Sequence, residues 1–353
     1  MDIEKFLLEK KPIIDSKLLE FLPKEPDEKY VEWAFGKARY AYDIETIKNS
    51  LSKPVWDILD RGGKRWRPIM LLLVNEAFGG DPEKVLDFTA TVEFSHEGSL
   101  LVDDIEDLSE LRRGKPCIHK IYGNDIAINA GNFMYFLPAL PFIKNRSGFD
   151  EKTLLNAYNI FTQEMINIHI GQGLDIFWHS GKKEDVKEEE YLQMCAYKTG
   201  TLARMSAKLG AVFANASEEQ VEKIGKFAEA VGVGFQIQDD ILSVVGDKFQ
   251  DKKGYGDDIT EGKRTLMVLY TLTKVSEDEK NRLLEILGMH TTDKKLIGEA
   301  LDILKKSGSV EYAKEKAKEI VKSAWLEVND ILEESDAKQK LKAFADFLVE
   351  REV

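Results

Sequence analysis

The chain has 353 residues, of which 43% are hydrophobic and 32% are charged, and its formal net charge is -13. This composition is typical of a soluble globular protein and excludes an intrinsically disordered chain. The acidic balance argues against bulk nucleic-acid binding, which requires a net basic face, although it leaves room for a local basic pocket. Two cysteines make no disulfide framework, so we expect a reducing, cytoplasmic location.

The N-terminal residues predict no signal peptide. Met1 to Lys5 carry charges of both signs, and no long apolar stretch follows. No apolar run approaches the ~18 residues that a membrane helix needs. The longest candidate, Phe133 to Ile143, is broken by Pro138 and Pro141. We therefore expect no membrane span.

Apolar residues with helical spacing occur along most of the chain. All nine prolines lie at or before Pro141, so the long remainder permits many helices. Apolar side chains recur at steps of three and four over 154–168 and 221–231. Ser217 and Ser276, each followed by acidic residues, predict helix starts. Because no alternating strand pattern is present, we predict one all-α domain over residues 1–353, a bundle of roughly ten or more helices.

The first acidic motif follows an apolar predicted helix. It reads Asp103-Asp104-Ile105-Glu106-Asp107, and Asp103 and Asp107 share one helix face. Two like charges one turn apart repel each other, and a divalent cation relieves this repulsion. Mg²⁺ takes one or two carboxylates and completes its shell with water and phosphate oxygens. A solvated acidic face is the alternative, which the preceding apolar residues disfavour.

A second acidic pair, Asp239-Asp240, ends an apolar helix that is predicted to begin near Val231. Two such pairs at the ends of apolar helices suggest facing walls of one central cavity. The alternative is two unrelated helix ends.

Basic residues cluster at a predicted helix start and directly after the first acidic motif. A helix N-terminus beside Lys and Arg favours a diphosphate site, and Arg grips phosphate through two hydrogen bonds. A basic surface loop is the alternative, but it does not explain why basic clusters lie beside acidic ones in an acidic chain. The cations concerned are Lys64, Arg65, Arg67, Arg112, Arg113 and Lys115, followed downstream by Lys198, Lys253 and Lys263.

Other site motifs are missing from the sequence. No Cys/His set has zinc spacing, and neither a phosphate-binding loop nor a nucleophile elbow is present. His96 lies two turns before Asp103, and a lone helical histidine is more often a core residue than a ligand.

From about Pro54 to Leu266 the chain resembles the trans-isoprenyl diphosphate synthases of the polyprenyl synthetase family. The resemblance implies an all-α fold around a central cavity, a homodimer, and Mg²⁺-dependent condensation of isopentenyl diphosphate with an allylic diphosphate (dimethylallyl, geranyl or farnesyl). It is carried by 62–68, 103–107, 112–116, Gly171-Gln172 with Asp175, Lys198-Thr199, 236–240 and Lys263-Arg264-Thr265.

The family's site residues transfer by position to this sequence. Those implied to hold the diphosphate of isopentenyl diphosphate are Lys64, Arg67, His96 and Arg113. Those implied to bind Mg²⁺ are Asp103, Asp107 and Asp239. Those implied to complete the clamp on the allylic diphosphate are Arg112, Lys198, Lys253 and Lys263, while Lys198, Thr199 and Gln236 are the implied catalytic residues.

Two departures from the family pattern affect the expectations. Ser243 stands where the second motif usually has a third aspartate, and Asn132 stands where an aspartate is common. We expect Asp239 and Asp240 to preserve metal binding.

Product length depends in the family on the residue five positions before the first motif. That residue is Gly98, which we interpret as an open tunnel floor. Geranylgeranyl diphosphate is the expected product, with farnesyl or longer chains as alternatives, and Gly98→Phe is expected to shorten it. A terpene cyclase, a non-catalytic partner subunit of a synthase and a pure scaffold protein are the rival interpretations.

Overall fold

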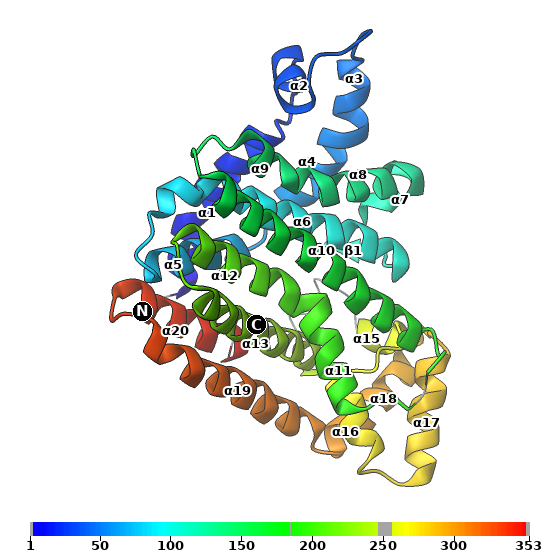
Figure 1. Ribbon diagram of the computed structural model, residues 1–353. Helices are drawn as coiled ribbons and strands as arrows, with labels where there is room; N and C mark the ends of the chain where they lie inside the picture. Colours follow the sequence, from blue (N-terminus) through cyan, green and yellow to red (C-terminus); the bar gives the residue numbers. More distant parts are fainter. Residues whose placement is uncertain (1–2, 184, 246–255, 351–353) are drawn as a thin grey trace. The chain divides into compact units, whose positions relative to one another are not determined.

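A computed structural model describes residues 3–183, 185–245 and 256–350, and nearly all of its secondary structure is helical (Figure 1). The predicted all-α class is therefore confirmed. Contacts divide the chain into two compact units. The first comprises Met1–Thr162, Met205–Val221 and Ser335–Lys338, and the second Gln163–Arg204, Glu222–Glu334 and Gln339–Val353. A single domain over the whole chain stays a prediction.

The first unit is built around the long helix α6 and its neighbours. Its elements are α1 (Ile3–Phe21), α2 (Glu28–Phe35), α3 (Ile44–Ile47), η1 (Lys48–Ser52), α4 (Lys53–Asp60), α5 (Trp66–Ala77), η2 (Pro82–Val85), α6 (Leu86–Glu106), β1 (Leu111–Arg112), β2 (Lys115–Pro116), α7 (Ile118–Tyr122), α8 (Asn124–Phe136), η3 (Leu137–Ala139) and α9 (Leu140–Lys144), together with parts of α10 (Glu151–His179) and α12 (Thr201–Phe213).

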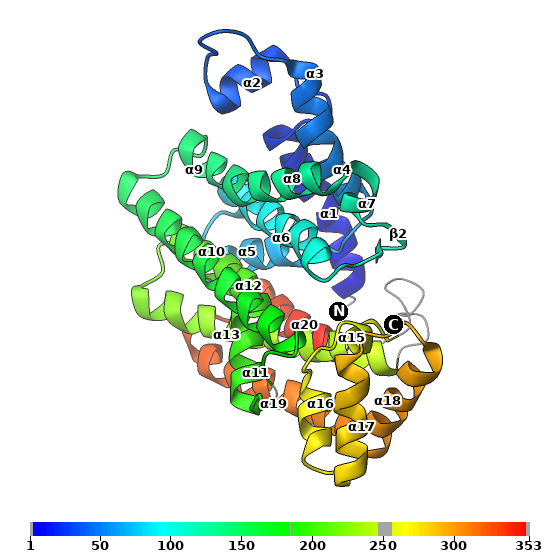
Figure 2. The same ribbon diagram turned by 90° about the vertical axis from the view of Figure 1, so that its right-hand side faces the viewer.

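Helices α6 and α8 lie side by side in both views (Figure 1 and Figure 2). Phe94 and Leu101 of α6 pack with Ala130 and Met134 of α8 in the core of this unit. After α6, the short strands β1 and β2 pair as a hairpin whose turn places Arg113 at φ 54°. One face of α6 is thus buried against α8, and its C-terminal end, which carries the first acidic motif, is followed directly by this hairpin.

The second unit holds the later helices. Its elements are the remainder of α10 and α12, then α11 (Glu188–Cys195), η4 (Ala196–Gly200), most of α13 (Glu218–Val245), α15 (Asp257–Thr260), α16 (Leu266–Leu272), α17 (Glu277–Gly288), α18 (Lys294–Lys306), α19 (Ser309–Val328), η5 (Asn329–Ile331) and most of α20 (Asp336–Glu350). The first residues of α13 and α20 belong to the first unit.

Local signals account for several helix ends in this part of the chain. Ser276 caps α17 in a reciprocal capping box with Glu279, as its sequence predicts. Helix α13 begins directly after Ser217 and runs without a break to Val245. The expectation of a separate helix beginning near Val231 is wrong, because the apolar period continues through that residue.

One stretch of the described residues, Asn124–Lys144, has the length and hydropathy of a membrane span. Half of it is buried inside the protein, and the turn η3 separates α8 from α9 at Pro138. This burial is typical of a core helix in a folded unit.

Candidate active site

The first acidic motif lies at the C-terminal end of α6, with Asp107 as the C-cap residue. Arg112 folds back from the hairpin onto it, with Nε 2.7 Å from Asp104 Oδ1 and Nη2 3.4 Å from Asp103 Oδ2. Asp104 is buried, and its burial raises the pKa of its carboxyl although Arg112 opposes the shift. Asp104 therefore anchors Arg112, while Asp103 and Asp107 stay partly exposed.

Asp103 and Asp107 form a donor set that fits Mg²⁺. Both offer only oxygen ligands, they lie one helical turn apart, and the negative end of the α6 dipole adds to their attraction for a cation. Over the ranges that the structure describes, no group of three or more ligating side chains gathers. Two carboxylates on one helix face leave room for the waters and phosphate oxygens that Mg²⁺ retains.

Two turns before this motif, a cationic cluster lies on α5 and α6. Arg67 Nη1 is 3.3 Å from His96 Nε2, and the Arg67 guanidinium stacks on the Trp66 ring at 4.3 Å. Burial lowers the pKa of Arg67 to about 10, although Glu93 and Glu97 oppose the shift. Burial, and then Arg67, hold the pKa of His96 well below 6.5, so its imidazole is neutral and can accept from Arg67.

Glu93 and Glu97 form a buried carboxylate pair behind these cations. Arg65 Nη1 lies 2.7 Å from Glu93 and 2.9 Å from Glu97, and Arg113 Nη2 donates to the same Glu97 oxygen at 2.9 Å. Arg65 is thus neutralised inside the unit, whereas Lys64 is exposed and pairs with Glu4 of α1. Sequence reasoning missed both glutamates, since an acidic residue in a helix usually belongs to its solvated face.

The second glycine of the basic motif, Gly63, has a structural reason to be glycine. Its φ is 126°, and a Cβ there would lie 3.2 Å from Arg65 Nη1 and 3.5 Å from Arg113 Nη2. Glycine therefore suits both the backbone conformation and the close approach of two guanidinium groups.

In the second unit, a π-helical turn presents Lys198 and Thr199. Lys198 Nζ lies 2.6 Å from Asp175 Oδ2. Burial raises the pKa of Asp175, but Lys198 and then Lys263 outweigh it, so the net pKa is lowered. A Cβ on Gly171 would meet the Lys198 backbone nitrogen at 2.2 Å, so glycine allows α10 to approach this turn. π-Helical turns frequently occur at functional sites.

Thr199 and Gln236 are in direct contact, as expected for two residues of one site. The Thr199 hydroxyl donates to Gln236 Oε1 at 2.7 Å, and Gln236 Nε2 donates to Asp240 Oδ1 at 2.8 Å. Tyr191 donates to the other oxygen of Asp240 at 2.8 Å. Burial, and then Asp258, raise the pKa of Asp240 to about 7. Asp240 thus lies within a buried hydrogen-bond network, whereas its neighbour Asp239 is partly exposed.

Ser243, which replaces the family's third aspartate, is the partner of Asp258. Its hydroxyl lies 2.5 Å from Asp258 Oδ2 and 2.8 Å from the carbonyl oxygen of Asp240. Asp258 of α15 therefore places a carboxylate next to position 243, although residue 243 is itself a serine. Nothing in the residues before Ser243 signals Asp258, which lies 15 positions further on.

Gly98 is not an open tunnel floor, and this expectation is wrong. A Cβ at Gly98 would lie 2.7 Å from Met134 Cβ and 3.3 Å from the Gly131 carbonyl oxygen. The space beside Gly98 is filled by α8, which the local sequence around the first motif does not indicate.

The predicted site residues thus fall into two groups. In the first unit, Arg67, His96 and Arg113 lie together, and Arg112 contacts Asp103. The corresponding group in the second unit is Lys198 and Lys263 around Asp175, with Thr199 on Gln236. Lys253 lies outside the described residues.

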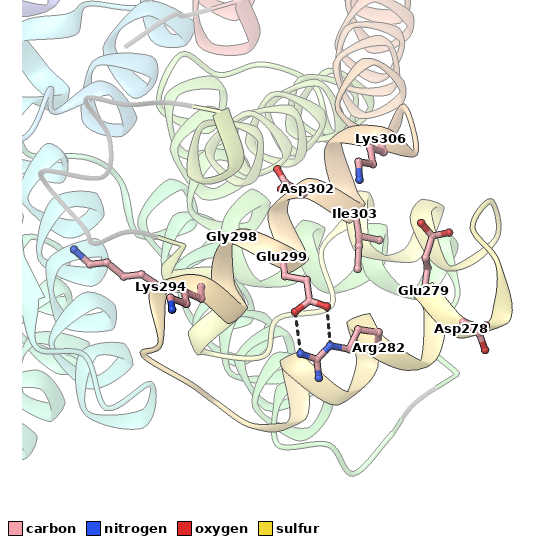
Figure 3. Close-up of a pocket in the computed structure, with 10 residues that line it drawn as sticks. Asp278, Glu279, Arg282, Lys294, Gly298, Glu299, Asp302, Ile303 and Lys306 are labelled. Atoms are coloured by element: carbon pink, nitrogen blue, oxygen red, sulfur yellow. Dashed lines mark hydrogen bonds and ion pairs between the residues drawn. The ribbon is translucent and has the colours of Figure 1, made fainter.

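A separate groove of about 670 Å³ lies between α17 and α18 (Figure 3). Two of the charged side chains that line it, Arg282 and Glu299, pair through two contacts of 2.8 Å. None of the predicted site residues lines it.

Comparison with known proteins gives one consistent result. The model of the family described as "Polyprenyl synthetase" matches residues 48–304. The short chain isoprenyl diphosphate synthase of Methanothermobacter thermautotrophicus is 36% identical, over 92% of this chain and 97% of that protein. The geranylgeranyl diphosphate synthase of Sulfolobus acidocaldarius is 35% identical, over 84% and 89%. The crystal structure of geranylgeranyl pyrophosphate synthetase from Pyrococcus horikoshii aligns with a TM-score of 0.84 at 32% identity, covering 99% of each chain.

Proposed function

Because the chain belongs to the polyprenyl synthetase family, we propose that it is a magnesium-dependent prenyltransferase that condenses isopentenyl diphosphate with an allylic diphosphate. The allylic substrate is dimethylallyl, geranyl or farnesyl diphosphate, and the main product is geranylgeranyl diphosphate. The relatives named geranylgeranyl diphosphate synthase support this chain length.

One observation carries the proposal: α6 and its neighbours offer two different diphosphate-binding chemistries. Arg67 and Arg113, with the neutral His96 beside Arg67, form a cationic cluster, and Asp103 and Asp107 form a metal-binding pair two turns further on. A condensing enzyme holds two diphosphates at once. A terpene cyclase holds one and has no use for the cationic cluster.

The roles of the side chains follow from the charges of the reaction. When bound, Mg²⁺ neutralises charge that develops on the leaving diphosphate. Arg112 of the first unit adds fixed positive charge beside the same aspartates, which favours ionisation. Lys198 and Lys263 of the second unit are assigned a corresponding role by the family resemblance. Arg67 and Arg113 hold isopentenyl diphosphate by its own diphosphate, so that its double bond is kept in attacking geometry.

Thr199 and Gln236 direct oxygen atoms at the allylic cation, and they stabilise it without bonding to it. No side-chain base is assigned to the final proton loss, because in the family the departed diphosphate is thought to take the proton. Water must be excluded, since it would trap the cation as an alcohol.

We further propose a homodimer in the cytoplasm. In the first unit, α8 exposes Ile128 and Phe136, and α10 exposes Leu155 and Tyr158. Apolar side chains exposed on two helices of one unit support an interface there, because exposed apolar patches mark protein interfaces. Light scattering of the purified protein measures the mass directly, and a monomer at micromolar concentration would contradict this proposal.

Turnover with labelled isopentenyl diphosphate and farnesyl diphosphate tests the reaction. We expect product with Mg²⁺ and none after chelation. Asp103→Asn and Asp107→Asn should lose activity, while Glu106→Gln, an exposed change within the same motif, should keep it. Equal activity in all three variants would refute a metal role for the two aspartates.

Two further experiments separate the rivals. Geranylgeranyl diphosphate supplied alone yields hydrocarbon if the protein is a cyclase, and none if it is a synthase. Turnover by the purified protein without any other subunit excludes a non-catalytic partner role.

A further inference from the structure

A buried tyrosine stands at one end of a chain of three hydrogen bonds that reaches Thr199. Tyr191 of α11 is 1% exposed, and its hydroxyl donates to Asp240 Oδ2 at 2.8 Å. Asp240 Oδ1 accepts from the Gln236 amide at 2.8 Å, and Gln236 Oε1 accepts from Thr199 at 2.7 Å. All four residues lie in the second unit.

The acceptor at each step fixes the orientation of the donor. A carboxylate oxygen accepts hydrogen bonds, so Gln236 turns its NH₂ group toward Asp240 and its oxygen toward Thr199. An amide oxygen can only accept, so the Thr199 hydroxyl commits its proton to Gln236. The lone pairs of Thr199 Oγ1 are consequently directed away from Gln236, and a fixed dipole of this kind stabilises positive charge without reorganising.

We propose that Tyr191 is a positioning residue for the condensation, holding Asp240 so that Gln236 and Thr199 keep their oxygen lone pairs turned toward the allylic cation. This inference rests on the proposed function and deepens it, because it extends the site to a side chain that is itself buried. The Tyr191 ring belongs to the apolar core of the second unit, where a phenylalanine ring would pack equally well. Packing alone therefore does not explain the hydroxyl group, because a buried hydroxyl is costly unless it is hydrogen-bonded. Its partner here is Asp240.

The alternative is that the hydroxyl only satisfies the buried Asp240 carboxylate. Tyr191→Phe distinguishes the two, because it removes one oxygen atom and keeps the ring. We expect kcat to fall about tenfold, a loss in the range of one hydrogen bond, while KM for both diphosphates changes less than about twofold. A purely structural role lowers the melting temperature and leaves kcat of the folded enzyme unchanged.

Tyr312→Phe is the matched control. Tyr312 of α19 donates to Glu188 Oε2 at 2.6 Å, which is also a tyrosine–carboxylate contact to helix α11, but it lies outside the chain of bonds to Thr199. We expect kcat of this variant to stay within about twofold of the wild-type value.

A double-mutant cycle gives the decisive reading. In a Thr199→Val background the end of the chain is removed, so Tyr191→Phe should lower kcat by less than about twofold further. An equal tenfold loss in both backgrounds, or no loss in the single variant, overturns the positioning role. If Tyr191→Phe does not fold, Tyr191→4-fluorophenylalanine fills the hydroxyl's volume without donating, and the same outcomes apply. A wild-type enzyme without turnover overturns the proposed function itself, whereas an active wild type with an unaffected variant overturns this inference alone.

Discussion

Ser243 donates a hydrogen bond to Asp258 across 2.5 Å, at the position where the family usually carries a third aspartate. Both residues are buried, and Asp240 lies close enough for Asp258 to raise its pKa. Restoring the aspartate by Ser243→Asp adds a third carboxylate and removes the donor. We expect the metal-free protein to lose about 2 kcal/mol or more of unfolding free energy, measured by urea denaturation.

Ser323→Asp on the exposed face of α19 controls for the charge added. It should change the unfolding free energy by less than about 0.5 kcal/mol. A Ser243→Asp protein as stable as the wild type would show that the serine–aspartate contact contributes nothing.

Glu97 accepts from two arginines at once, so its neutralisation removes a buried negative charge that both of them share. We expect Glu97→Gln to lower the unfolding free energy by about 3 kcal/mol, and to raise KM for isopentenyl diphosphate because Arg113 loses its anchor. Glu4→Gln breaks the exposed pair with Lys64 and should cost less than about 1 kcal/mol. Equal losses in the two variants would contradict the buried network.

Gly98 is required by packing, so even a methyl group there should be harmful. Gly98→Ala is expected to lower the unfolding free energy by about 1–3 kcal/mol, because α6 and α8 must separate. Gly173→Ala in α10 meets nothing within 4 Å and should stabilise the protein by about 0.5–1 kcal/mol. Gly98→Phe should therefore yield an unstable protein. A stable Gly98→Phe enzyme with a shortened product would restore the tunnel-floor interpretation.

His96 makes stability depend on pH. Its pKa in the folded protein is well below that of the unfolded chain, so below about pH 6.5 the unfolded chain binds more protons. Its contribution is fully present above the unfolded pKa and is lost as the pH falls toward the folded pKa. The loss reaches up to about 1.4 kcal/mol per pH unit. His96→Gln should show a smaller decline in unfolding free energy between about pH 7.5 and 5.5. Parallel curves for the two proteins would contradict this linkage.

The features predicted well from the sequence are those that depend only on residues close together in the chain. Ser276 and Glu279 lie three residues apart, and their capping box depends on little else. The face shared by Asp103 and Asp107 follows from helical geometry alone. The roles proposed for His96 and Arg113 came from the family resemblance, since spacing alone favours a core role for a lone helical histidine.

The missed features all depend on contacts between distant segments. Glu97 looks like a solvated residue until Arg65 and Arg113 are placed against it. Gly98 looks like open space until α8 is packed beside it. The hydroxyl of Tyr191 finds its partner 49 positions away, so no local pattern reveals it.

Product analysis tests the proposed condensation most directly. The purified protein is incubated with Mg²⁺, isopentenyl diphosphate and each allylic diphosphate in turn, and the products are identified by mass spectrometry after removal of the diphosphate. We expect geranylgeranyl diphosphate as the main product from every primer. If protein that is shown to be folded elongates none of the primers, this expectation is contradicted.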